Sequence, residues 1–526
     1  MARSQEIILM ATKSHKYYLD VGRATDLKNR RERRIYRALE ILPGSLVWFT
    51  LIGMILFSWL FPAFTAYFII IFCVYWVLRT THFAVHLIAA YRKMKNNLEE
   101  DWQEKLSLLP ATDWRKIYHL VIFPTYKENL PVLRGSFKAL ARAKYPKERI
   151  IVVLGMEERA GEEARKIAKE IKREFGDKFF KLLITVHPEG IEGEIAGKGS
   201  NECWAGKEAK EKIIDPLKIP YQNVIVSCFD ADTQVFPQYF SCLTYYYLTS
   251  PNALRSSFQP IPLYFNNILE APFFSRVVSS SNVFWQMMQQ QRPEKVTTYS
   301  SHSMPFQALV DMNFWQPNVV SEDAGAFWKA FLFYDGDYQI IPIHYPLSMD
   351  SCVAKNTFRT AVNQYKQQRR WAWGSEGIPY LLFGFWKNKK IPFYKKFRYA
   401  FLLLESFWAW GTNALLLLCL GWLPLLLGGS EFNSTLLSYN LPQATSNLLT
   451  FALIGLLACV VVSTLLLRWS PFPISRRKTM LMVSQWVFLP FSLIIFGAIP
   501  AIEAQTRLML GKYMGFFPTE KFRKKP

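Results

Sequence analysis

Residues 149–186 read RIIVVLGMEERAGEEARKIAKEIKREFGDKFFKLLITV, and this stretch decides the fold. It begins and ends with short apolar runs, Arg149–Leu154 and Lys181–Val186, each as long as a buried strand. Between them, apolar residues recur at the three- and four-residue spacing of a buried helix face that ends at Gly176: Ala164, Ile167, Ala168, Ile171 and Phe175. A strand, a helix and a second strand in this order predict a parallel sheet with a crossover helix.

Two further apolar runs extend the pattern in both directions. His119–Phe123 precedes the quoted stretch and ends at Pro124, and Tyr221–Phe229 follows it. We therefore expect one α/β domain, clearest over residues 112–390 and bounded at 92–399. Ligands of parallel sheets bind outside the carboxyl ends of the strands, so the polar residues directly after each run are the first candidates for a site.

Apolar segments of membrane-spanning length flank this domain. Two precede it and are predicted to form a hairpin, Leu46–Phe61 and Phe64–Leu78. Three follow it, Ala400–Leu427, Leu448–Leu467 and Met480–Ile502. A soluble helix of this length would carry a polar stripe, whereas these segments carry almost no charge apart from Glu405. The chain is therefore expected to divide into a basic segment 1–42, a transmembrane hairpin 43–91, the domain 92–399 ending in interfacial helices, transmembrane helices 400–510 and a basic tail 511–526.

Composition and charge favour a membrane protein over a nucleic-acid-binding protein. The 526 residues are 51% apolar and 16% aromatic, which excludes a disordered chain, and the net charge is +22. The basic residues of 1–40 and of Lys521–Lys525 lie near apolar segments, so we expect an anionic lipid surface, and no nucleic acid, as their partner. The seven cysteines form no Cys-x-x-Cys pair, which is typical of free thiols in a reducing compartment.

Loop charges predict an integral protein of the cell membrane with a cytoplasmic domain. Residues 1–40, 92–116 and the loop Arg468–Lys478 are basic, whereas residues 428–446 contain no Lys or Arg. One point stays open. A single crossing by Met480–Ile502 would leave the basic tail outside, whereas breaks at Pro490 and Pro500 would make that segment re-entrant or a hairpin.

Residues able to carry chemistry follow the predicted strands in a definite order. In chain order they are Pro124–Asn129, Gly155–Glu158, the Gly-rich Gly190–Asn201, Asp230-Ala231-Asp232, Ser321-Glu322-Asp323 and Gln367 with Arg370 and Trp371. Each motif alone is weak, because Asp-x-Asp and Glu-Asp are common in solvated turns and at helix starts. As an ordered set over about residues 115–400, they resemble the motifs of family-2, membrane-embedded inverting glycosyltransferases, the group of cellulose, chitin and hyaluronan synthases. The resemblance is specific at Asp-x-Asp, Ser-Glu-Asp and Gln-x-x-Arg-Trp.

The resemblance implies a GT-A-like, Rossmann-like fold for the domain and a role for each motif. Asp323 matches the catalytic base, and Asp232 matches the ligand of a Mg²⁺ or Mn²⁺ cofactor that neutralises the leaving diphosphate. A nucleotide-sugar donor, by resemblance a UDP-sugar, would contact Thr125, Tyr126, Glu128, Glu157, Lys198, Asp230 and Arg370. A polysaccharide or lipid acceptor would contact Glu322, Gln367 and Trp371.

Simple chemistry agrees with several of these roles and leaves others open. Gln367, Arg370 and Trp371 fall at i, i+3 and i+4, so they share one helix face, where the Arg could grip a diphosphate and the Trp could stack on a sugar or cover a channel entrance. Lys198 is either a donor to the nucleotide or a loop lysine in water. Two motifs depart from the family pattern. Gly155–Glu158 replaces an Asp-Asp-Gly turn, which leaves the carboxylate at the nucleotide base open, and Ser321 replaces Thr.

Three functions remain open from the sequence. The first is a processive synthase that extends a β-linked polysaccharide and exports it through its own helices, and the second is transfer of one sugar to a membrane lipid. The third is a transporter or scaffold with an inactive domain, which the intact acidic motifs argue against. His82 and His86 stand at i, i+4, but without a third ligand nearby they are interpreted as a helix-end pair rather than a metal site.

Overall fold

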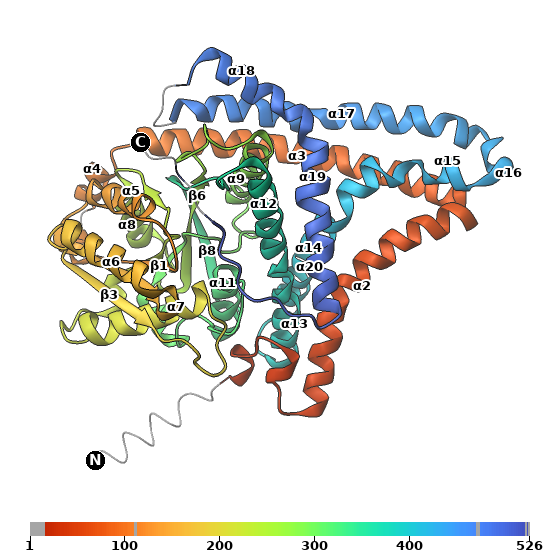
Figure 1. The fold of residues 1–526 in the computed structure, drawn as a ribbon. Coiled ribbons are helices and arrows are strands. Elements are labelled where there is room, and N and C mark those ends of the chain that lie inside the picture. Colours follow the sequence, from red (N-terminus) through yellow and green to blue (C-terminus); the bar gives the residue numbers. More distant parts are fainter. Residues whose placement is uncertain (1–15, 110–112, 470–473, 521–522, 524–526) are drawn as a thin grey trace.

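A computed structural model describes residues 16–109, 113–469, 474–520 and 523. Its α/β domain is built on one eight-stranded sheet of order β3-β2-β1-β4-β7-β6-β8-β5 (Figure 1). The strands are β1 (Tyr118–Thr125), β2 (Ile150–Glu157), β3 (Lys181–His187), β4 (Val224–Cys228), β5 (Gln234–Val235), β6 (Ser256–Leu263), β7 (Ser303–Pro305) and β8 (Gln339–Ser348). β1 to β4 are mutually parallel, β6 is parallel to β8, and β5 and β7 pair antiparallel with their neighbours.

The predicted fold class is confirmed. A mostly parallel sheet, Rossmann-like in its first half, lies between helices long and apolar enough to cross a membrane. The four apolar runs identified in the sequence are the strands β1 to β4. The sequence predicts that the first run ends at Pro124, but β1 continues to Thr125. It can do so because the pairing of β1 with β4 stops at Ile122, so the missing N–H of Pro124 leaves no gap on that side.

Alternate residues of the strands point into two cores, one on each face of the sheet. Val121 and Phe123 of β1 belong to the first core, whereas Leu120 and Ile122 belong to the second. Crossover helices α5 (Leu130–Ala141) and α6 (Gly161–Phe175) pack into the first core, and α7 (Lys198–Ala209) packs into the second. The remaining helices of the domain are α4 (Trp102–Ser107), α8 (Tyr239–Thr249), α9 (Phe273–Gln290), α10 (Phe306–Asp311), α11 (Glu322–Phe333), α12 (Thr357–Ala372) and α13 (Gly377–Lys387).

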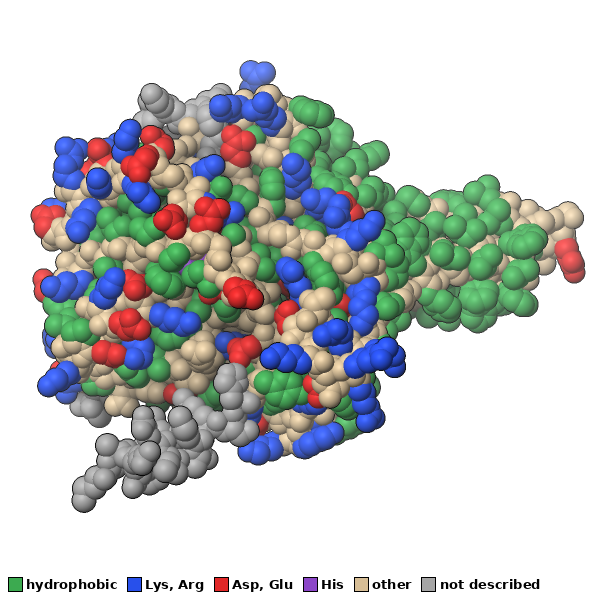
Figure 2. All heavy atoms as spheres, turned by 60° about the horizontal axis from the view of Figure 1, so that its bottom comes forward, with side chains coloured by type: hydrophobic (Ala, Val, Ile, Leu, Met, Phe, Trp, Pro, Cys, Tyr) green, Lys and Arg blue, Asp and Glu red, His purple; other side chains and the backbone are tan. Residues whose placement is uncertain are grey.

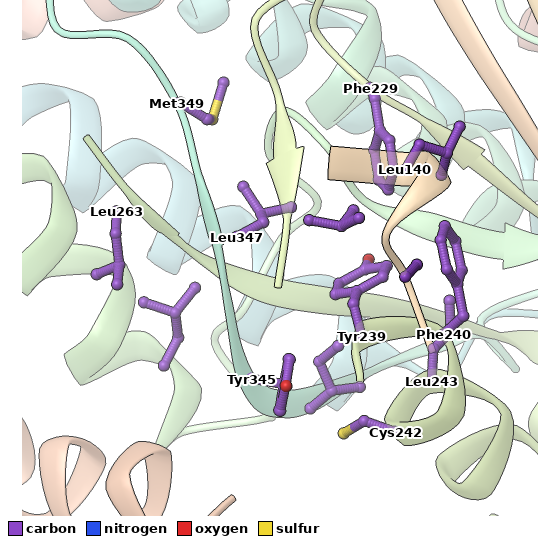
Figure 3. Close-up of a cluster of buried hydrophobic side chains, with 14 of the residues drawn as sticks. Leu140, Phe229, Tyr239, Phe240, Cys242, Leu243, Leu263, Tyr345, Leu347 and Met349 are labelled. Carbon is purple, nitrogen blue, oxygen red and sulfur yellow. The ribbon is translucent and has the colours of Figure 1, made fainter. Parts of the chain in front are cut away.

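The first core fixes the end of β4. Figure 3 shows Phe229, which directly follows that strand, beside Tyr239 and Phe240 of α8. The ring centroids of Phe229 and Tyr239 are 5.8 Å apart, and those of Tyr239 and Phe240 are 5.3 Å apart. Because Phe229 is fully buried, the backbone that leads into Asp230 is held in one position at the carboxyl end of the sheet.

Five helical stretches are long and apolar enough to cross a membrane, by length and composition. They are α2 (Arg30–Leu60), α3 (Pro62–Glu99), α14 (Phe393–Leu418), the stretch of α17 (Leu436–Leu466), and the broken stretch Arg476–Met509 formed by α18 (Arg476–Ser484), α19 (Leu489–Leu493) and α20 (Ile499–Met509). α2 begins well before the apolar segment predicted at Leu46, because its polar first half packs on the domain. There, Tyr36 is fully buried and lies 5.3 Å from the ring of Phe383 on α13.

Four of these helices form an apolar projection that ends in a tip (Figures 1 and 2). α2, α3, α14 and α17 run between the domain and the tip, where α15 (Leu423–Leu427) and α16 (Gly429–Asn433) turn the chain. The start of α3 packs closely against the turn between α15 and α16, since a Cβ placed on Gly428 would lie 2.8 Å from Cβ of Pro62. Hydrophobic side chains cover the projection in the view of Figure 2.

The stretch Arg476–Met509 does not run to the tip (Figure 1). It lies against α9 and α14 instead. The rings of Phe488 and Phe273 are 4.9 Å apart, and Nε2 of Gln505 donates to the carbonyl oxygen of Phe407 at 3.0 Å. A 3₁₀ turn and a π turn interrupt this stretch beside Pro490 and Pro500. The start of α2, the α/β domain and the described C-terminal residues therefore all lie at the end of the molecule away from the tip (Figure 1).

Candidate active site

The polar residues that follow the parallel strands meet at one edge of the sheet. Asp230 follows β4, Lys198 opens α7 after the Gly-rich loop, and Glu322 and Asp323 form the first turn of α11. The side chain of Lys198 is only 10% exposed. The interpretation of Lys198 as a loop lysine in water is therefore wrong.

The ammonium of Lys198 lies among four carboxylates. Its Nζ is 2.7 Å from Oδ2 of Asp323, 3.0 Å from Asp230, 3.3 Å from Glu322 and 3.5 Å from Glu202. Burial lowers the pKa of Lys198, but the carboxylates, Asp230 and Asp323 foremost, outweigh burial and raise the pKa well above 10.5. The lysine is therefore a fixed positive charge at the centre of the site.

Two of these carboxyl groups hold their protons more tightly than ordinary glutamates. Glu202 is fully buried, and burial raises its pKa well above 4.5. Burial, with the negative charge of Asp323, raises the pKa of Glu322 to about 7, although Lys198 and Arg370 act against this shift. One ligand atom from each of Glu202, Glu322 and Asp323 lies within 4.8 Å of the others, a spacing that suits a cation. Among the described residues, the ammonium of Lys198 is the cation that lies there.

Asp323 is held at its position by both neighbouring segments. The hydroxyl of Thr298 donates to its carbonyl oxygen at 2.5 Å, and Nδ1 of His302 lies 3.8 Å from its Oδ1. Before α11, one oxygen of the half-buried Glu376 accepts from the backbone N–H groups of Val320 at 2.9 Å and Ser321 at 2.8 Å. The start of α11, and with it the Asp323 carboxylate, is therefore tied to the segment that follows α12.

Asp232 lies in a second carboxylate pair beside the first cluster. Its Oδ2 accepts from the backbone N–H of Asp350 at 3.0 Å, and Asn266 donates both to the carbonyl oxygen of Asp232 and to the carboxylate of Asp350. Arg523 grips Asp350 through Nη2 at 2.6 Å and Nε at 3.0 Å. Asp232 and Asp350 are both buried. The oxygen donors of these two buried carboxylates are the ligand type that a hard divalent metal ion prefers, and the pairing with Arg523 shows that positive charge is bound there.

The Gln-x-x-Arg-Trp residues lie half-buried near the end of α12. Arg370 is close enough to act on the pKa of both Glu322 and Tyr264, and Asp230 and Asp232 act on Tyr264 as well. Arg370 therefore lies within electrostatic range of both carboxylate groups. Gln367 accepts from Gln364 at 3.1 Å, and Trp371 lies on the same helix face.

The residues predicted after β1 and β2 interact mainly with one another. The hydroxyl of Thr125 donates to the carbonyl oxygen of Gly155 at 3.0 Å, and the carboxylate of Glu128 accepts from the N–H of Tyr126 at 2.7 Å. Glu157 pairs with Arg159 at 2.5 Å, and the Arg159 guanidinium lies 4.5 Å from the ring centre of Tyr126. These residues form a polar rim at the ends of the two strands.

The described C-terminal residues cross the mouth of the site. After α20 the chain runs past α11 and α12 toward β6 (Figure 1). Phe516 lies against Gly197, and the Arg370 guanidinium lies 4.9 Å from the centre of its ring. Farther on, Lys366 lies 4.9 Å from the ring centre of Phe517. Sequence reasoning treated these residues as a basic tail and gave no sign that they would lie in the site.

Sequence reasoning also missed Glu202, Asp350, Glu376 and Arg523 as residues of the site. Glu202 lies one helical turn after Lys198, so the i, i+4 spacing was a signal that could have found it. His82 and His86 do stack, at 3.9 Å between ring centroids, but they lie in the interior of α3 rather than at a helix end, because α3 continues to Glu99.

No protein-family model matches the sequence, and no curated protein matches it. Among solved structures, the chain is similar to the mannosyltransferase PcManGT from Pyrobaculum calidifontis in complex with GDP-Man and Mn²⁺, with 15% identity, 84% of this chain and 100% of that chain covered, and a TM-score of 0.41. It is also similar to S. aureus TarS 1–349 in complex with UDP-GlcNAc, with 13% identity, 72% and 91% covered, and a TM-score of 0.36. Both TM-scores are below 0.5.

Proposed function

We propose that the protein is a membrane-embedded inverting glycosyltransferase of the family-2 type. It would move a sugar from a nucleotide diphosphate, by resemblance UDP, to a growing β-linked polysaccharide and export the product through its own helices. The observation that carries the proposal is the meeting of Asp323, Asp230 and Lys198, with Nζ of Lys198 2.7 Å from Asp323 and 3.0 Å from Asp230. Asp232 and Arg370 support it, because both act on Tyr264 at the same edge of the sheet.

In the proposed reaction Asp323 is the general base. Its carboxylate takes the proton of an acceptor hydroxyl while the hydroxyl oxygen attacks the anomeric carbon of the donor. The bond from that carbon to the diphosphate oxygen breaks, and the nucleoside diphosphate leaves with the electron pair. A single displacement inverts the anomeric centre, so one base suffices and no second carboxylate nucleophile is needed. The ammonium of Lys198 lies 2.7 Å from Asp323 and holds the carboxylate in place.

Positive side chains would hold the diphosphate of the donor. Arg370 presents a planar guanidinium that can donate two parallel hydrogen bonds to phosphate oxygens. Lys198 adds a point charge that is already fixed between Asp230 and Asp323. The rim residues Thr125, Tyr126, Glu128 and Glu157 are the proposed contacts of the nucleoside, and Glu322, Gln367 and Trp371 those of the acceptor.

Asp232 is the proposed ligand of Mg²⁺ or Mn²⁺. The fit rests on the oxygen-only donors of the buried Asp232 and Asp350, of which Asp350 already binds a positive charge, the guanidinium of Arg523. A bound ion would neutralise charge that develops on the leaving diphosphate. We expect Asp232→Ala to abolish turnover and to weaken nucleotide binding in Mg²⁺ or Mn²⁺. Full activity of the unchanged protein in the presence of a chelator would overturn the metal role.

The proposal is tested with radiolabelled nucleotide sugars and membrane vesicles that contain the full chain. A panel of donors, followed by linkage analysis of the product, identifies the sugar. A long, glycosidase-sensitive product supports the polysaccharide synthase. A single lipid-soluble band would instead assign transfer of one sugar to a membrane lipid. No hydrolysis or transfer with any donor, and no change on Asp323→Asn, would make the domain an inactive scaffold.

The proposed site of action is the cytoplasmic face of the cell membrane. The described C-terminal residues lie at the same end of the molecule as the α/β domain and opposite the tip (Figure 1). The basic residues 1–40 and 92–116, together with the absence of Lys and Arg from 428–446, favour the domain side as the inside.

A further inference from the structure

Basic side chains gather where the apolar helices meet the α/β domain. We call His82 of α3, Arg292 and Lys295 of the loop after α9, and Arg398 of α14 the edge cluster. Nη1 of Arg292 donates to Nε2 of His82 at 2.9 Å. Nη2 of Arg398 donates to the carbonyl oxygen of Glu294 at 3.3 Å. Three segments that are distant in the sequence thus meet at this place.

The edge cluster carries more positive than negative charge. His82 accepts a hydrogen bond through Nε2 from a guanidinium, which can only donate, so its ring is neutral. Arg292, Lys295 and Arg398 are then the three cations of the cluster. Glu294 pairs with Arg292, and the neighbouring Glu405 pairs with Arg79, so the excess of positive charge remains. Lys295 and Arg398 are exposed, and neither forms an ion pair within the described part of the chain.

The edge cluster lies at the depth of lipid headgroups. His82 stands about 20 residues along α3 from Pro62 at the tip, which is roughly 30 Å of helix and about the thickness of the hydrocarbon core. Exposed aromatic side chains, typical of a membrane interface, stand near Arg398 in the chain, at the end of α13 and the start of α14: Trp386, Phe393, Tyr394, Phe397 and Phe401. On the face seen in Figure 2, Lys and Arg side chains also gather where the projection meets the body.

We propose that the edge cluster binds the phosphate of an anionic phospholipid in the leaflet on the domain side. Arg and Lys side chains at this depth recognise phosphate oxygens by charge-assisted hydrogen bonds, and uncompensated cations between membrane helices favour an anionic headgroup. The loop that carries Arg292 and Lys295 continues into the candidate active site. Three residues after Lys295, the hydroxyl of Thr298 donates to the carbonyl oxygen of Asp323 at 2.5 Å. The proposal concerns lipid binding and does not depend on the proposed enzymatic function.

The test is native mass spectrometry of the full chain in detergent, titrated with phosphatidylglycerol or with phosphatidylcholine of the same acyl chains. We expect the unchanged protein to bind phosphatidylglycerol roughly tenfold more tightly, and the double variant Lys295→Gln/Arg398→Gln to lose this preference. The matched control Arg477→Gln/Lys478→Gln removes two exposed charges from α18 and should keep the preference. Thermal unfolding of both variants checks that they are folded.

Three results would overturn the proposal. Equal affinity of the unchanged protein for the two lipids would remove the evidence for an anionic headgroup. An undiminished preference in Lys295→Gln/Arg398→Gln would locate the lipid elsewhere. Displacement of phosphatidylglycerol by millimolar inorganic phosphate would assign the edge cluster to a soluble phosphate rather than to a lipid.

Discussion

The ammonium of Lys198 and the carboxylate of Asp323 are joined by two hydrogen bonds, 2.8 Å to Oδ1 and 2.7 Å to Oδ2. The same ammonium lies 3.0 Å from Asp230, so one cation connects the first turn of α11 with the end of β4. The two residues belong to motifs more than one hundred positions apart, and the Gly-rich loop before α7 lets Lys198 reach between them. Substitutions of these two residues and of their neighbours should therefore change the activity or the stability of the protein.

Asp323→Asn should lower sugar transfer by roughly 10²–10⁴-fold, because the amide keeps the shape of the side chain but takes no proton from the acceptor. Binding of the nucleoside diphosphate should change little. The measurement is initial transfer rate with a radiolabelled donor, together with calorimetric titration of the diphosphate. Asp337→Asn, an exposed carboxylate paired with Arg255, is the matched control. Undiminished transfer by Asp323→Asn would assign the base to another residue.

Lys198→Met should destabilise the protein by about 3 kcal/mol, because it leaves buried carboxylates without their cation. Adding Glu202→Gln should restore part of this loss, since Glu202 is fully buried and contributes one of the four carboxyl groups. The measurement is thermal unfolding of the single and double variants in detergent. If Glu202→Gln gives no recovery in the Lys198→Met background, the two side chains are not coupled as the structure indicates.

Glu376→Gln should weaken the attachment of α11 to the segment after α12. One carboxylate oxygen accepts from Val320 and Ser321, and the other accepts from Nε1 of Trp373 at 2.7 Å. The amide of Gln has one oxygen, so it can accept either from Val320 and Ser321 or from Trp373. Its NH₂ group would then face the other donor. We expect a loss of about 1–3 kcal/mol in the free energy of unfolding and slower transfer with nucleotide binding unchanged.

A second substitution separates this positioning effect from a general loss of packing. Trp373→Phe removes the donor that would oppose the amide, so it should cost less in the Glu376→Gln background than in the unchanged protein. Equal costs in the two backgrounds would mean that the hydrogen bond to Trp373 does not hold the segment.

The first half of the sheet and the order of the motifs could be predicted because both depend on local sequence. A run such as Ile150–Leu154 is apolar at every position, as a strand buried on both faces must be. The pair of Asp350 with Arg523 could not be predicted in the same way. The two residues are 173 positions apart, and neither belongs to a periodic pattern or a motif. Glu376 resembles any polar residue in a turn until the fold brings Val320 and Ser321 against it.

The apolar segments were predictable in number but not in path. Hydropathy alone cannot distinguish α17, which runs to the tip, from Arg476–Met509, which lies against α9 and α14. The difference comes from tertiary contacts such as that of Gln505 with Phe407, and from the breaks beside Pro490 and Pro500.

Cysteine labelling should therefore place the α/β domain and the end of α20 on one side of the membrane and the tip on the other. Cys419, the one exposed thiol among the seven, is first replaced by Ser. We expect Ser430→Cys to react with a membrane-impermeant maleimide from one side of sealed vesicles, and Lys166→Cys and Lys512→Cys to react only from the other. Labelling of Lys512→Cys from the same side as Ser430→Cys would show that Arg476–Met509 crosses the membrane.

Acid should destabilise the domain through His119. This side chain is buried on β1, Nε2 lies 2.8 Å from Oγ1 of Thr244, and burial lowers the pKa of His119 to about 3. An unfolded chain takes up a proton near pH 6.5, which the folded protein cannot do until about pH 3. The stability contributed by the neutral ring is therefore complete above pH 6.5 and is lost as the pH falls, by up to about 1.4 kcal/mol per pH unit.

His119→Gln should flatten the fall in thermal midpoint between pH 6.5 and 5 while leaving the difference between pH 7.5 and 8.5 unchanged. An identical pH profile for the variant would show that the ring is already protonated, or already exposed, in the folded protein.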